Sequence, residues 1–127
     1  NKDMAYFLIL LNGKDIGFTS IRYSPILEII ALFIDKKYRC KGYGATIIRK
    51  LEKILWNTGH KSKDEEIQIV TGTNNYKAQK LYMSLGYTEY KRNDLYVFYK
   101  KKMWLTPFFF SIIYNKHRRQ TIIWMAY

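Results

Sequence analysis

The sequence predicts an α/β domain built on one mixed β-sheet. Three observations support this fold class. Apolar runs of strand length recur along the chain, two amphipathic helical stretches lie among them, and turn signals separate the elements. With 127 residues, the chain is long enough for one domain with one hydrophobic core.

Three strands are expected at the start of the chain. The first two flank Asn12-Gly13, a dipeptide that favours the positive backbone angles of a tight hairpin turn. The third is almost wholly apolar and rich in β-branched residues, which predicts a central strand covered on both faces. The expected ranges are 4–11, 16–23 and 27–34.

Two helices and three further strands are expected after a polar loop over 35–44. Apolar residues recur at helical spacing over 45–56, and residues 57–59 should end that helix. A second helix should start after N-cap residue types at 73–75 and end near Gly86. Its apolar stripe is Ala78, Leu81, Tyr82 and Leu85, and the remaining strands are expected over 67–70, 87–91 and 95–101.

The chain divides by composition into two parts. Residues 1–103 hold all of these elements and form the predicted core domain, without repeats or a low-complexity linker. Residues 104–127 interleave aromatic side chains with a basic run over 116–119 and form a predicted C-terminal extension. The pattern leaves open whether this extension is a short helix or strand, an oligomer contact, a lid or a tail.

The charge balance favours anionic partners. The net charge is +12, from 22 basic and 10 acidic residues, which suits a phosphate-bearing cofactor or nucleic acid. No apolar run approaches the roughly 18 residues of a membrane-spanning helix, so no membrane partner is expected. A single cysteine, Cys40, excludes an intrachain disulfide, and the start shows no signal-peptide pattern. A cytoplasmic location is therefore the default expectation.

The loop before the first helix carries the strongest chemical signal. It reads Arg39-Cys40-Lys41-Gly42-Tyr43-Gly44, and its glycines allow the backbone to approach a ligand closely. The helix that follows presents unpaired N–H groups and the positive end of its dipole. By itself this pattern fits a pyrophosphate cradle or an ordinary turn.

Two motifs together resemble the signatures of the GNAT superfamily of N-acetyltransferases. They occur in the order of that family, with the expected elements between them, and the similarity spans Met4 to Met103. The chain departs from many members at Cys40, where they have glycine. The motifs are Arg39-x-x-Gly42-x-Gly44 and Asn75-x-x-Ala78-x-x-Leu81-Tyr82-x-x-x-Gly86-Tyr87.

The resemblance implies an enzyme that uses acetyl-CoA as co-substrate. No metal is expected, because the sequence has no cysteine–histidine cluster. The resemblance also implies a mixed sheet with helices on both faces, splayed between the strands over 27–34 and 67–70. The pantetheine arm would pair with the end of the first of these strands, and the pyrophosphate would bind amides of the glycine-bearing loop. The expected cofactor-binding residues are Leu32, Phe33, Ile34, Arg39, Cys40, Lys41, Gly42, Tyr43, Gly44, Ala45, Asn75, Ala78 and Tyr82.

Two residues are candidates for proton transfer during direct attack in a ternary complex. Glu28 is the only acidic residue within the apolar strand over 27–34. A carboxylate that is buried accepts a proton more readily than an exposed one, which suits a general base. The alternatives are that Glu28 is solvated or ion-paired, for instance with Arg22, or that a water chain is the base. The resemblance places Tyr82 near the CoA sulfur as an acid, although a tyrosine on an apolar stripe is usually a core residue.

The acceptor is expected to be an amine on a small molecule or a protein, and a homodimer is left open. Family members normally have a strand and two helices before the hairpin that begins here, and those helices wall the acceptor pocket. Either they are missing at the front of this chain, or the residues after Met103 replace part of that wall. Two other functions stay open: a non-catalytic acyl-CoA-binding module, and a basic nucleic-acid-binding domain that would leave both motifs unexplained.

Overall fold

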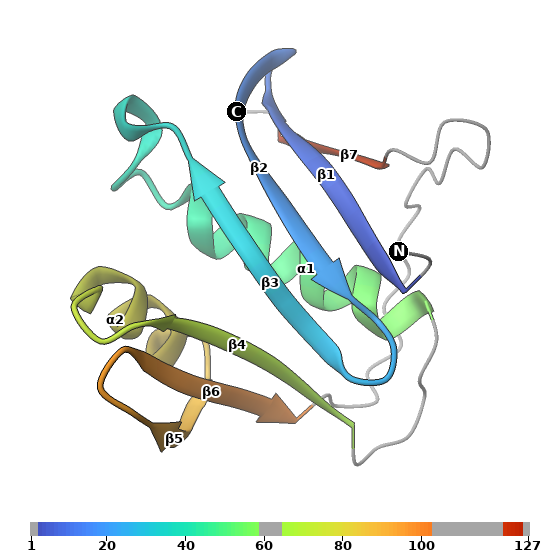
Figure 1. The fold of residues 1–127 in the computed structure, drawn as a ribbon. Helices are drawn as coiled ribbons and strands as arrows, with labels where there is room; N and C mark the ends of the chain where they lie inside the picture. The colour runs from blue at the N-terminus through green and yellow to red at the C-terminus, as the bar shows by residue number, and fades with distance from the viewer. Residues whose placement is uncertain (1–2, 59–64, 103–120, 126–127) are drawn as a thin grey trace.

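The structure is a computed structural model that describes residues 3–58, 65–102 and 121–125. In these residues one sheet contains seven strands in the order β5-β6-β4-β3-β2-β1-β7 (Figure 1). The strands are β1 (Met4–Leu11), β2 (Lys14–Arg22), β3 (Leu27–Ile34), β4 (Glu66–Gly72), β5 (Thr88–Arg92), β6 (Tyr96–Lys102) and β7 (Thr121–Met125). The helices are α1 (Tyr43–Thr58), α2 (Tyr76–Ser84) and a short 3-10 helix, η1 (Lys36–Tyr38).

The local signals in the sequence place most elements to within two residues. Asn12 and Gly13 have φ angles of 50° and 84°, which confirms the hairpin turn between β1 and β2. The Asn75 side chain caps α2 by accepting a hydrogen bond from the N–H of Ala78 at 3.2 Å. Gly86, with φ 93°, follows the end of this helix. Gly59, the expected stop of α1, lies outside the described residues.

The core lies between one face of the sheet and the two helices. Alternate strand residues such as Ile29, Ile69 and Tyr99 are buried, and α1 contributes Leu51 and Leu55 to the same cluster. The expectation that β3 is covered on both faces is wrong. Leu27 and Ile29 are buried, but the other residues of the strand are at most half-buried, and Phe33 near its end is 45% exposed. In the described residues, only one face of this strand is packed under a helix.

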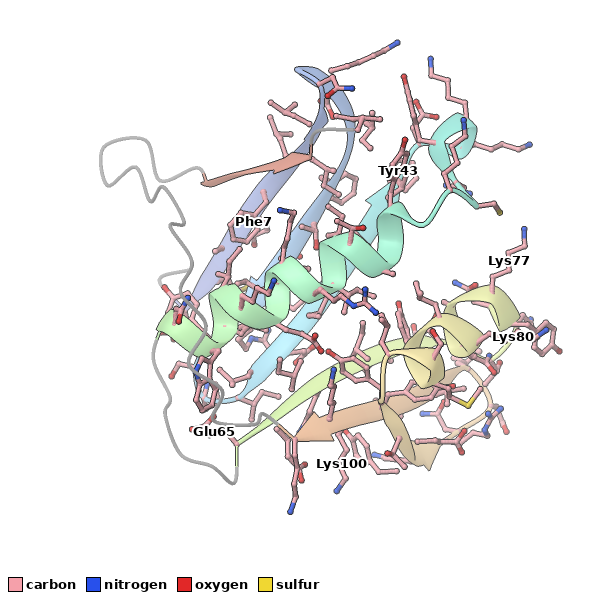
Figure 2. The ribbon with its side chains drawn as sticks, turned by 180° about the vertical axis from the view of Figure 1, so that it is seen from behind. Phe7, Tyr43, Glu65, Lys77, Lys80 and Lys100 are labelled. Carbon is pink, nitrogen blue, oxygen red and sulfur yellow. The ribbon has the colours of Figure 1, made fainter. Side chains whose placement is uncertain are left out.

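Both helices lie on the same face of the sheet. Tyr82 of α2 makes an edge-on ring contact with Tyr99, and Lys101, two residues further along β6, pairs with Glu52 of α1. Residues two apart on a strand point to the same face, so both helices cover that face. Figure 2 shows α1 in front of β1, β2 and β3, with α2 in front of β4 and β6. The family resemblance implied helices on both faces; the described residues have them on one.

Part of the C-terminal extension joins the sheet. The backbone of β7 pairs in parallel with β1, from Phe7↔Thr121 to Leu11↔Met125. The rest of residues 104–127, including the basic run over 116–119, lies outside the described residues. The boundary at residue 103 stays a prediction. Neither of the two α-helices in the described part of the chain is long and apolar enough to cross a membrane.

Candidate active site

The sheet opens between β3 and β4. These two parallel strands pair at three positions only, Leu27↔Ile67, Glu28↔Gln68 and Ile29↔Ile69. Beyond them, β3 continues to Ile34 against β2, and β4 continues to Gly72 against β6 (Figure 1). The edge of β3 that faces β4 is therefore outside the ladder over 30–34, where an extended amide-bearing chain can pair with it.

The glycine-bearing loop lies at the open end of this splay. Gly42 has φ 84°, and a Cβ atom there would meet nothing within 4 Å, so the backbone faces open space. The N–H of Thr46 donates to the Gly42 carbonyl, which begins α1. Among the backbone hydrogen bonds of the described residues, the amides of Lys41 and Gly44 donate none. These amides and the helix dipole favour an anion at this position.

Arg39 anchors the loop on the end of β3. Its Nε donates a hydrogen bond to the Ile34 carbonyl at 2.7 Å, and its guanidinium lies 5.3 Å from the centre of the Phe33 ring. That ring in turn stacks on Phe18 at 5.4 Å. The structure thus brings Arg39 together with two other expected cofactor-binding residues. It also indicates that this side chain orients the loop in addition to supplying charge.

Lys77 is a cation that the sequence analysis did not single out. It occupies the first turn of α2, and its Nζ lies 3.6 Å from the Cys40 sulfur. Figure 2 shows its side chain reaching from α2 toward the loop between β3 and α1. Its position two residues after Asn75, inside the second motif, is the sequence feature that could have identified it as a cofactor-binding candidate. Together with Lys41, it adds positive charge beside the exposed loop.

Tyr82 is a residue of α2, and its ring packs between this helix and the sheet, against Tyr99 of β6. Its side chain is 7% exposed and contacts the rings of Tyr87 and Tyr99, with centroids 6.3 and 5.7 Å away. Burial, followed by the nearby Tyr99 phenol, raises the pKa of Tyr82 to about 12. This phenol is therefore a neutral proton donor at physiological pH. Asn75 and Ala78, the other expected residues on this motif, share the start of α2 with Lys77.

Glu28 lies where β3 and β4 are still paired, at the closed end of the splay. It is opposite Gln68 in the register, and its Oε2 is 3.4 Å from Arg22 Nη1. The ion pair that the sequence left as an alternative is therefore present. Because Leu27 and Ile29 point into the core, Glu28 points to the other face of the sheet. Glu28 and Tyr82 therefore lie on opposite faces of the sheet.

A separate pocket of about 290 Å³ lies over β1, β2 and the end of β3. Its lining includes Asp15, Phe18, Phe33 and Asp35. Asp15 also accepts a hydrogen bond from the Gly17 amide at 3.1 Å. The pocket adjoins β3 on the side of β2, away from the gap toward β4. In the described residues, no group of three or more acidic, cysteine or histidine side chains could hold a metal ion.

Several solved structures with a similar fold are acetyltransferases. The PaiA N-acetyltransferase from Thermoplasma acidophilum, in complex with coenzyme A, superposes with a TM-score of 0.67 at 19% identity, over 80% of this chain and 62% of its own. An acetyltransferase from Thermus thermophilus gives 0.68 at 16% identity, over 81% and 66%. The N-acetyltransferase PseH from Campylobacter jejuni, in complex with acetyl coenzyme A, gives 0.66 at 19%, over 80% and 70%. This chain thus spans less than two thirds of the length of the Thermoplasma acidophilum and Thermus thermophilus proteins.

Sequence comparison identifies the family directly. No curated protein is similar enough in sequence to be counted as a relative. The profile of the acetyltransferase (GNAT) family, however, matches residues 1–87, which is more than half of the chain. This range includes the hairpin, the glycine-bearing loop, both helices and Tyr87. The chain therefore belongs to the acetyltransferase (GNAT) family.

Proposed function

We propose that this protein transfers the acetyl group of acetyl-CoA to a primary amine, on a small molecule or a protein, by direct attack in a ternary complex. The observation that carries the proposal is the gap between β3 and β4, with a glycine-bearing loop and the start of α1 at its open end. Such a gap suits a long, amide-bearing and phosphorylated cofactor. The complexes of the PaiA and PseH proteins with coenzyme A and acetyl coenzyme A support this assignment.

The cofactor would use both parts of the gap. Its pantetheine arm would pair with the free edge of β3 near Leu32, Phe33 and Ile34, and its pyrophosphate would bind the loop amides from Arg39 to Ala45. Lys41 and Lys77 would balance the phosphate charge. The space beside Gly42 supports this fit. A Cβ atom at that position would meet nothing within 4 Å, so a phosphate group can approach the loop backbone there.

Amide formation from an ammonium requires three proton transfers, because two protons leave nitrogen and one reaches sulfur. An alkyl amine has a pKa of about 10.4, so a base must take a proton before its nitrogen attacks the thioester carbonyl. Glu28 is the proposed base, acting directly or through water. As the carbon–sulfur bond breaks, the thiolate takes a proton from Tyr82, which its raised pKa of about 12 keeps protonated at neutral pH. The acylated nitrogen gives up its second proton through water, which restores the Tyr82 phenol, and the proton taken first by Glu28 passes to solvent. Backbone N–H groups near Phe33 would polarise the thioester carbonyl. The products are the N-acetyl amide and CoA.

A thermal-shift experiment with a matched pair of glycine variants tests the cofactor site. Gly42 and Gly13 both have φ 84° and open space where a Cβ atom would lie, so Gly42→Glu and Gly13→Glu impose the same backbone strain. At about 100 times the Kd, acetyl-CoA should stabilise native protein and Gly13→Glu by roughly 2.7 kcal/mol. Gly42→Glu should gain little, because its carboxylate would occupy and repel the phosphate site. Equal shifts in all three would rule out this loop.

A non-catalytic acyl-CoA-binding module is the second candidate function. The ion pair between Glu28 and Arg22 favours it, because Arg22 engages a carboxylate oxygen that the enzyme would need to turn toward an amine. The two functions differ in turnover. A panel of amines with saturating acetyl-CoA, followed by release of free thiol, should show amine-dependent turnover for the enzyme. Stabilisation by acetyl-CoA without thiol release for any amine would favour the binding module.

A further inference from the structure

The halves of the sheet are weakly joined at the gap. Three register pairs connect β3 to β4, so the separation of the strands beyond Ile29 must be set by contacts elsewhere. The glycine-bearing loop leads into α1, which covers the β1–β3 half, whereas Tyr82 belongs to the β4–β6 half (Figure 2). A contact between α1 and the β4–β6 half would therefore control how far the loop lies from Tyr82.

Glu52 of α1 makes one such contact, in addition to the apolar packing that includes the approach of Gly44 to Leu81. Its Oε2 accepts a hydrogen bond from the Tyr87 hydroxyl at 2.9 Å and lies 3.0 Å from Lys101 Nζ. Its side chain is 14% exposed, and Tyr87 is 3% exposed. The Lys101 ammonium also lies 5.5 Å from the Tyr87 ring centre. A charged, hydrogen-bonded group with little access to water holds its partners more firmly than an exposed ion pair does.

Tyr87 connects this contact to Tyr82. The Tyr87 amide donates to the Tyr82 carbonyl at 3.0 Å, and the two rings are tilted neighbours at 6.3 Å. Burial and the adjacent Glu52 carboxylate raise the pKa of Tyr87 well above its usual range, so its hydroxyl remains a donor to Glu52. A displacement of Glu52 would therefore reach the Tyr82 ring through one intervening side chain.

We propose that Glu52 is a positioning residue which, by holding Tyr87 and Lys101, fixes Tyr82 at the right distance from the cofactor across the β3–β4 gap. The inference rests on the proposed function, in which Tyr82 protonates the departing thiolate. Proton donors must lie within hydrogen-bond reach of their target, and a misplacement of about 1 Å can lower a rate 100-fold. A core ion pair that served stability alone would instead leave the rate per folded molecule unchanged.

The first measurement compares Glu52→Ala with Glu66→Ala. Glu66 pairs at 3.7 Å with Lys100, the neighbour of Lys101 on β6, so its loss removes a similar pair on the opposite face. We expect Glu52→Ala to lower kcat at least 10-fold while the Kd for acetyl-CoA changes less than about 2-fold. Glu66→Ala should change neither. Glu52→Gln, which keeps an acceptor for Tyr87, should recover part of the rate. Should Glu52→Ala fold poorly, Tyr87→Phe removes the same hydrogen bond and keeps the ring.

The second measurement repeats the substitution in a Tyr82→Phe background. If Glu52 acts through Tyr82, Glu52→Ala should lower kcat little further when the phenol is already absent. The same fold loss in both backgrounds would overturn the inference, because it would mean that Glu52 acts independently of Tyr82.

Amide hydrogen exchange tests the contact without turnover. Glu52→Ala should speed exchange in α2 and β6 about 10-fold or more relative to native protein and Glu66→Ala, since the β4–β6 half loses a buried polar tie to α1. Unchanged exchange there would contradict the inference even in an active enzyme. If Glu52→Ala shows this exchange difference but native protein binds acetyl-CoA and acetylates no amine, the proposed function is refuted and Glu52 remains only a tie between the two halves of the sheet.

Discussion

Gly17 of β2 lies directly against the backbone of Phe33 in β3. A Cβ atom on Gly17 would overlap the Phe33 carbonyl oxygen and lie 3.1 Å from the Cα of Ile34. Both neighbours are backbone atoms, which cannot rotate away as a flexible side chain can. The absence of a side chain at Gly17 therefore allows β2 to hold the end of β3, whose other edge is the proposed pantetheine-binding edge.

Gly17→Ala should weaken both the fold and the cofactor site. The added methyl group must push β2 and β3 apart, and overpacking of this kind costs about 1–3 kcal/mol. We expect a lower urea midpoint and a higher Kd for acetyl-CoA. Gly72→Ala is the matched strand control, since a Cβ there would lie 3.8 Å from the Leu95 carbonyl oxygen, in ordinary contact. A Gly17→Ala variant as stable as Gly72→Ala would contradict the close approach.

Cys40→Gly should stabilise the protein and preserve acetyl-CoA binding. Cys40 has φ 61°, a left-handed conformation that costs a residue with a Cβ roughly 1–2 kcal/mol, and glycine adopts it without that cost. Part of the gain is offset by the greater freedom of glycine in the unfolded chain. Cys40→Ala keeps the strain and loses only the contact with Lys77, so it is the control. The melting temperature of Cys40→Gly should be higher than that of Cys40→Ala, and equal values would argue against strain at this position.

Stability should fall in alkaline solution as Tyr82 ionises. The pKa of its phenol rises from 10.0 to about 12 on folding, because burial disfavours the charged form. The contribution is therefore fully present below pH 10 and is lost as the pH rises toward 12. At roughly 1.4 kcal/mol per pKa unit, the stability of native protein relative to Tyr82→Phe should fall by about 2–3 kcal/mol. Urea unfolding of both proteins over this pH range measures the difference, and a constant difference would argue against a buried, neutral phenol.

Glu28→Gln and Arg22→Gln separate catalysis from ion pairing. Both substitutions break the 3.4 Å contact, but only the first removes the carboxylate. If Glu28 is the base, Glu28→Gln should lower kcat by roughly 100-fold to 10,000-fold while Arg22→Gln retains most activity. Steady-state rates at saturating acetyl-CoA measure both. Equal rates in the two variants would assign the proton transfer to another group or to water.

The sequence predicted the elements and the loop well because their causes are local. The Asn12-Gly13 turn, the Asn75 cap and the glycine after α2 each depend on residues within one turn of the chain. Both candidates for proton transfer could also be named from the sequence, although only the family motif indicated Tyr82. Their roles stay proposals, as does the cofactor-binding set.

Residue patterns along the chain were enough to show where strands and helices begin, which loop has glycines before a helix, and that two GNAT motifs are present. The folded structure was needed to show that β3 and β4 separate after three pairs, that Arg39 contacts the end of β3, that Lys77 reaches Cys40, and that Glu52 contacts Tyr87 and Lys101. It also decided that both helices share one face, which overturned the expected burial of β3. The reason is that such contacts join residues far apart in the chain, and they depend on strand register and helix placement, which no local residue pattern encodes.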